Sequence, residues 1–177
     1  RDGMTVSFHH HLRNGDAVVN RTIDILAELG IKNITLAASS LSSVHAHLIS
    51  YLEDGTITEI WTSGMRGELG KAVSMGKLAY RAVIHSHGGR ARAISTGELS
   101  IDLAVLAAAA ADEEGNATGC RGPSSFGSMG YAIMDARYAR QVIVVTDNIV
   151  PYPCYPISIE QTNVDYVVNV NSLGDVR

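Results

Sequence analysis

Residues 4–38, MTVSFHHHLRNGDAVVNRTIDILAELGIKNITLAA, decide the fold class of this chain. The apolar and β-branched run at 4–8 predicts a strand. Residues 16–29 predict a helix that Asp16 caps and Gly30 ends, because their apolar side chains recur at helical spacing. Residues 33–38 predict a second strand. A strand, a helix and a strand in succession form a unit whose two strands run parallel.

The same alternation continues along the rest of the chain. After the first unit we expect a helix over 41–52, a glycine-rich loop over 64–70, and strands at 56–62, 79–85, 99–111, 141–146 and 165–170. Parallel neighbours need crossover connections, and these place helices on both faces of a sheet. The predicted fold class is therefore α/β, a three-layer α/β/α arrangement around a mostly parallel sheet.

The alanine-rich run at 99–111 allows two interpretations. Alanine has the highest helix propensity, which favours a helix. Small residues also suit a strand that is closely covered on both faces, and leucine, isoleucine and valine are interspersed with the alanines. We favour the buried strand and keep the helix as the alternative.

Composition limits the classes of protein to which the chain can belong. With 46% hydrophobic and 18% charged residues, the 177 residues suit one folded domain, 1–177, and exclude a disordered chain. The net charge of −4 provides no broad basic surface for nucleic acid or an anionic membrane. No apolar run approaches the length of a membrane span.

Cys120 and Cys154 have no metal-type spacing, so we expect two free thiols, as in a reducing cytoplasm.

Polar residues gather directly after the predicted strands. Ligands of open parallel sheets bind beyond the carboxyl ends of the strands, so these loops are the predicted site. We expect substrate-binding roles for His9, His10, His11, Arg13, Asn14, Ser63, Arg66, His85, His87, Arg90 and Arg92. The arginines can pair with carboxylates.

Gly88 and Gly89 are the predicted catalytic residues. Glycines let backbone N–H groups approach a ligand closely, and such groups stabilise the oxyanion of an acyl transfer. A glycine pair alone also fits an ordinary turn, so its position after a strand is what favours the catalytic role.

Paired histidines raise a second hypothesis, a metal-dependent hydrolase. His9 and His11, like His85 and His87, are two residues apart and would share one face of an extended segment, with His10 on the opposite face. Imidazole pairs bind zinc or iron, but such sites usually add a carboxylate, and none is obvious here. We therefore expect no metal. A third hypothesis is a non-catalytic ligand-sensing domain of the same fold.

Three stretches resemble the citrate lyase α chains, a family within the CoA-transferase superfamily. They are DGMTVSFHHH at 2–11, IHSHGGRAR at 84–92, and the segment from Ile101-Asp102 to ADEEGN at 111–116. The third is widespread among CoA-transferases, whereas the first two are more specific to citrate lyase. The resemblance covers essentially the whole chain.

The resemblance implies a CoA-transferase (NagB/RpiA-like) fold and a cytoplasmic enzyme of citrate metabolism. Such a subunit transfers the thioester of the acyl carrier protein from acetate to citrate, giving citryl thioester and acetate. No cofactor is expected on this domain, because the CoA-like phosphopantetheine group belongs to the carrier (γ) subunit, and a β subunit then cleaves the product. Many related transferases use a glutamate in a Ser-Glu-Asn-Gly context, which is absent here, so transfer through an acid anhydride is expected. The family chain has two similar halves, and this sequence resembles the first.

Overall fold

The computed structural model describes residues 1–10, 12 and 17–174, and its centre is a seven-stranded parallel sheet. The strand order is β4-β3-β2-β1-β5-β8-β9. These strands are β1 (Thr5–His9), β2 (Ile34–Ala38), β3 (Ile57–Thr62), β4 (Ala82–Ile84), β5 (Leu103–Ala107), β8 (Gln141–Thr146) and β9 (Tyr166–Asn169). The prediction of a parallel sheet is confirmed.

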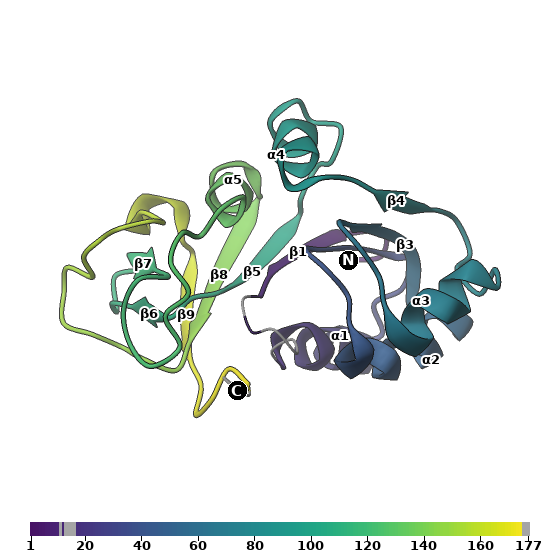
Figure 1. The fold of residues 1–177 in the computed structure, drawn as a ribbon, viewed down its shortest axis with the longest axis horizontal. Helices are drawn as coiled ribbons and strands as arrows, with labels where there is room; N and C mark the ends of the chain where they lie inside the picture. Colours follow the sequence, from purple (N-terminus) through teal and green to yellow (C-terminus); the bar gives the residue numbers. More distant parts are fainter. Residues whose placement is uncertain (11, 13–16, 175–177) are drawn as a thin grey trace.

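Helices lie on both faces of this sheet, so the predicted three layers are present (Figure 1). One face carries α1 (Val18–Glu28), the 3-10 helix η1 (Ser43–Leu48), α2 (Ile49–Glu53) and α3 (Gly67–Ser74); the other carries α4 (His87–Ser95) and α5 (Ala132–Tyr138). Each face has its own buried cluster. Val6 and Phe8 belong to the first cluster, and Ala104 and Leu106 belong to the second.

The sheet is built outwards in two directions from its centre. β1 pairs with both β2 and β5, so that Val6 lies opposite Leu36 on one side and Leu103 on the other. The chain first adds β2, β3 and β4 on one side, and α4 then returns it to β5 on the other side. The order of the strands reverses at β1 and β5, and ligands of open α/β sheets bind at such a point.

The predicted strands are confirmed, although several are shorter than expected. The run at 99–111 is not helical, but only Leu103–Ala107 forms the strand β5, and the chain bends before the two-residue strand β6 (Ala110–Ala111). β6 pairs with β7 (Ala117–Thr118) in a separate ribbon.

The helix predicted over 41–52 forms as η1 followed by α2. The helix predicted over 16–29 begins at Val18, and its expected cap, Asp16, lies outside the described residues.

Two predicted loops are wrong in part, because each contains the start of a helix. α3 begins at Gly67 within the expected loop 64–70, and its apolar residues Leu69 and Ala72 are buried. α4 begins at His87, where Ser86 provides a helix cap that the sequence analysis did not use. A helix near Arg137 was expected without bounds and is present as α5, whereas the short 3-10 helix η2 (Gln161–Asn163) was not predicted.

Both cysteines are free thiols, as expected; Cys120 is exposed and Cys154 is buried. Within the described part of the chain, no helix is long and apolar enough to cross a membrane.

Candidate functional site

A cleft of about 370 Å³ opens at the carboxyl ends of the central strands, where the fold predicts a site. Its walls come from the segments after β1, β2 and β3, from the start of α4, and from the segment that precedes α5. The lining residues are His9, His10, Leu12, Ser39, Ser40, Ser63, His87, Ser128, Met129, Gly130 and Tyr131. Hydroxyl and imidazole groups therefore dominate the polar part of the cleft.

His9 is a buried, neutral imidazole at the wall of the cleft. Burial lowers its pKa to about 4, despite the hydrogen bond to a backbone carbonyl. Nδ1 lies 3.2 Å from the Ala107 carbonyl oxygen, and because a carbonyl only accepts, Nδ1 carries the proton. Nε2 is then the basic atom of the ring. Contacts with the rings of Phe126 and Tyr131 fix the orientation of the imidazole.

His10 lies on the opposite side of the strand end from His9. Its Nε2 is 3.2 Å from the Ser39 hydroxyl, and its ring lies 5.5 Å from that of the buried His45. His45 Nδ1 accepts a hydrogen bond from the Ser42 backbone, and burial lowers the pKa of this ring as well. The predicted divergence of His9 and His10 is confirmed, whereas His11, Arg13 and Asn14 lie outside the described residues.

A buried ion pair supports the floor of the cleft. The Arg90 guanidinium is fully buried and contacts Asp135, with 3.4 Å between Nη2 and Oδ1. Nη2 also donates to the Ser7 hydroxyl at 2.6 Å and to the Ala37 carbonyl at 3.1 Å, and Ser7 in turn donates to Asp135. The Tyr131 ring lies over the guanidinium, 4.7 Å from Cζ to the ring centroid.

The structure places the Arg90 side chain beneath the cleft, and this position does not favour the predicted contact with citrate. Its charge is satisfied by Asp135, Ser7 and backbone carbonyls, and the side chain does not line the cleft. Tyr131 is a cleft residue that contacts the guanidinium. In this geometry the Arg90 guanidinium packs against a ring that lines the cleft.

The Gly88-Gly89 pair forms the first turn of α4 rather than a loop. The Gly89 N–H donates to the Ser86 hydroxyl at 3.0 Å, so this donor is already used within the protein. A Cβ at Gly89 would lie 3.1 Å from that hydroxyl, whereas a Cβ at Gly88 would meet nothing within 4 Å. Neither glycine lines the cleft, but the adjacent His87 does, with its ring 5.7 Å from that of Tyr131.

The remaining predicted residues divide between the cleft and other places. Ser63 lines the cleft, and its N–H donates to the Ser39 carbonyl. Arg66 is exposed in a separate hollow beside α3. Arg92 is exposed and pairs with Glu98. His85 lies against Trp61, with 6.2 Å between ring centroids, and burial lowers its pKa.

Sequence reasoning missed the wall formed by residues 128–131. These residues follow a glycine-rich stretch that folds back on itself, as Phe126 and Gly127 both donate their N–H groups to the Gly119 carbonyl. A Cβ at Gly119 would lie 2.3 Å from the Gly127 carbonyl oxygen, so the close approach requires glycine. The density of glycine between 115 and 130 is the signal that could have indicated this loop.

Among the residues that the structure describes, His9 and His85 do not converge on a metal site. His9 faces Ala107 and Tyr131, while His85 lies against Trp61 on a different strand end. In residues 1–10, 12 and 17–174, no group of three or more His, Cys, Asp or Glu side chains is placed to hold a metal ion. The geometry offers no support for the hydrolase hypothesis.

Comparison with known proteins gives the family. The family model for the citrate lyase alpha subunit (CitF) matches residues 1–177. The chain belongs to the citrate lyase alpha subunit family. It is 51% identical over 175 residues to the citrate lyase alpha chain of Escherichia coli K12, covering 99% of this chain and 34% of that protein. This family member thus spans about a third of the length of the curated relatives it matches.

Two similar solved structures agree with membership of the citrate lyase alpha subunit family. A Streptococcus mutans protein described as an alpha subunit of citrate lyase, solved in complex with citrate, is 52% identical with a TM-score of 0.95, over 99% of this chain and 34% of that one. Glutaconate coenzyme A-transferase from Acidaminococcus fermentans is 14% identical with a TM-score of 0.67, over 96% of this chain and 71% of that one. This more distant likeness shows that the citrate lyase alpha domain has the CoA-transferase fold, as expected.

Proposed function

We propose that this chain is part of a citrate lyase alpha subunit and that its cleft binds citrate for an acyl transfer. In this reaction a citrate carboxylate attacks the acetyl thioester of the acyl carrier protein and expels the thiolate, which leaves a mixed anhydride of citrate and acetate. The thiolate then attacks the citryl carbonyl of the anhydride, so that citryl thioester forms and acetate leaves. The observation that carries the proposal is the match to the alpha subunit family over residues 1–177.

The chemistry of the cleft supports a carboxylate ligand. The hydroxyl of Ser40 and the imidazole of His87 can donate hydrogen bonds to carboxylate oxygens, whereas the Ser63 hydroxyl donates to the Ser39 carbonyl and the Ser39 hydroxyl contacts His10. The close relative of known structure was solved in complex with citrate. Holding one carboxylate beside the thioester converts a bimolecular attack into an intramolecular one, which is a large part of what such a site supplies.

His9 gives the cleft a neutral wall. A ring with a pKa of about 4 stays uncharged at neutral pH. A neutral ring adds no positive charge for the trianion. The lining that the structure describes includes no arginine or lysine. We retain His11, Arg13 and Asn14, which follow His9 and His10 in the sequence, as candidate contacts that add donors and a cation.

The proposal also includes the partner subunits and the cytoplasmic location of the enzyme. The acetyl group arrives on the CoA-like phosphopantetheine arm of the carrier (γ) subunit, and a β subunit receives the citryl product. The two free cysteines suit a cytoplasmic enzyme. The residues that complete the site come from the remainder of the longer family chain.

Citrate titration of the full-length protein by calorimetry, with transfer kinetics from acetyl carrier protein, tests the proposal. Loss of one hydrogen bond in His87→Ala should weaken citrate binding by about tenfold. Arg66→Ala is the matched control, because Arg66 lies in another hollow, and it should bind citrate normally. Weakened binding in Arg66→Ala with unchanged binding in His87→Ala would place citrate outside the cleft. A full-length protein that binds citrate without turnover would favour the sensor hypothesis.

A further inference from the structure

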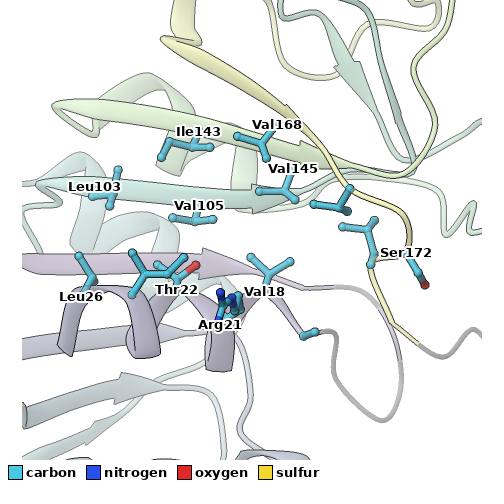
Figure 2. Close-up of a pocket in the computed structure, with 14 residues that line it drawn as sticks. Val18, Arg21, Thr22, Leu26, Leu103, Val105, Ile143, Val145, Val168 and Ser172 are labelled. Atoms are coloured by element: carbon cyan, nitrogen blue, oxygen red, sulfur yellow. The ribbon is translucent and has the colours of Figure 1, made fainter. Parts of the chain in front are cut away.

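A second cavity, an apolar groove of about 430 Å³, lies on the α1 face of the sheet and shares no lining residue with the candidate site (Figure 2). Its floor is made of side chains from β5, β8, β9 and the segment after β9, and its side wall is α1. The apolar lining residues are Ala17, Val18, Ile25, Leu26, Leu103, Val105, Ile143, Val145, Val168, Val170 and Leu173; Arg21, Thr22 and Ser172 add the few polar groups.

The groove is a part of the sheet that lacks its third layer. On the opposite face α4 and α5 cover the second buried cluster, which includes Leu106 and Val144. On the α1 face, α1 packs at the rim, and Figure 1 shows none of the described helices beneath β8 and β9, which carry Ile143 and Val168. Parallel sheets occur almost only with both faces covered. Val168 and Ile25 are each 42% exposed as a result.

The C-terminal end of the described chain lies at this groove. Leu173 lines the groove, and its carbonyl accepts a hydrogen bond from the Ala17 N–H just before α1. The curated relatives are about three times as long as the matched stretch, so the family chain has ample length to reach the groove.

We infer that the groove binds an amphipathic helix of the same polypeptide. This helix belongs to the part of the family's longer chain that flanks residues 1–177. The five residues of β5 extend about 17 Å, which corresponds to about 11 helical residues. The apolar stripe of this helix packs on β5 and β8 beside α1. Its polar edge lies beside Arg21, where an acidic side chain would be favoured.

Photo-crosslinking in the full-length protein tests this inference. Benzoylphenylalanine is introduced in place of Val168 or Ile25, and light and isotopically heavy proteins are mixed before irradiation. We expect intramolecular crosslinks to a peptide outside residues 1–177. The same group in place of Tyr80, which is 73% exposed and away from the groove, should not crosslink to that peptide. A light–heavy crosslink would assign the groove to a second copy, and a crosslink to another subunit would assign it to a partner; either result overturns the inference.

A charge substitution provides an independent measurement. Val168→Asp in the full-length protein should lower the melting temperature by several degrees, because the carboxylate would be buried beneath the helix. Tyr80→Asp should leave the melting temperature unchanged within about a degree, as exposed substitutions do. Equal melting temperatures for Val168→Asp and the unmodified protein, or the absence of any crosslink, would show that the groove is open to solvent.

Discussion

Replacing Arg90 by methionine tests whether this residue supports the cleft from below. Methionine fills much of the space of the arginine stem but removes the charge that neutralises Asp135. Both side chains are essentially inaccessible to solvent, so the remaining carboxylate is left unpaired in a low-dielectric interior. Removal of one partner of such a pair costs about 3–5 kcal/mol in the free energy of unfolding. For a domain of this size, that is a decrease in melting temperature of about 10 °C.

Arg92 on the same helix provides the matched control. It too was predicted to bind citrate, but its side chain is 62% exposed and pairs with Glu98 at the surface. Arg92→Met should therefore change the free energy of unfolding by no more than about 1 kcal/mol. The double variant Arg90→Met/Asp135→Leu should recover much of the stability lost in Arg90→Met, since it removes both charges.

Thermal unfolding of the three variants and the unmodified protein decides the question. A melting temperature for Arg90→Met equal to that for Arg92→Met would refute the reasoning, as would a double variant no more stable than Arg90→Met. Citrate affinity provides the second readout. In Arg90→Met/Asp135→Leu, Tyr131 loses the cation beneath its ring, so citrate should bind more weakly even where the fold is restored.

Three further predictions concern the first turn of α4, the buried imidazole and the glycine loop. Gly88→Ala should stabilise the protein by up to about 1 kcal/mol through helix propensity, while Gly89→Ala should not, because its methyl group crowds the capping hydroxyl; equal melting temperatures would contradict this. Because His9 has a pKa of about 4 when folded and an ordinary pKa of 6.5 when unfolded, its contribution to stability is present above pH 6.5 and is lost as the pH falls towards 4. Urea unfolding should show that His9→Asn reduces the acid loss by about 3 kcal/mol, and an unchanged loss would count against a neutral His9. Gly119→Ala should weaken citrate binding by about tenfold or more in calorimetry, as its methyl group displaces the loop before Tyr131; normal affinity would mean that this loop does not shape the site.

The layers of the fold could be predicted from the sequence because their signals are local. Residues 4–38 contain a strand, a helix and a strand with clear periodicity, and the pairing of β1 with β2 follows from parallel crossover. The starts of α3 and α4 were missed because glycine is a weak helix former. At α4 a capping serine and buried contacts outweigh that preference, and Gly88 and Gly89 are helical as a result.

The sequence predicts a site at the edge of the sheet where the structure has a cleft, but it does not indicate which of the predicted residues line that cleft. Position after a strand places His9 and Ser63 near the cleft, and sequence alone can provide that much. It does not reveal which way a long side chain turns. Arg90 turns inwards because Asp135, 45 residues further along the chain, provides a buried partner. Tyr131 reaches the cleft through a loop whose path depends on the contact between Gly119 and Gly127.

The alternation along β1 makes the length of this strand more critical than its composition. Ser7 faces the ion pair and Phe8 belongs to the core on the α1 face, while His9 and His10 extend the same alternation into the cleft. A deletion of Val6 or Ser7 would shift Phe8 to the position beside the guanidinium and His9 to the position in the core on the α1 face. Natural variation in this segment should therefore consist of substitutions, and insertions or deletions should be confined to the loops around it.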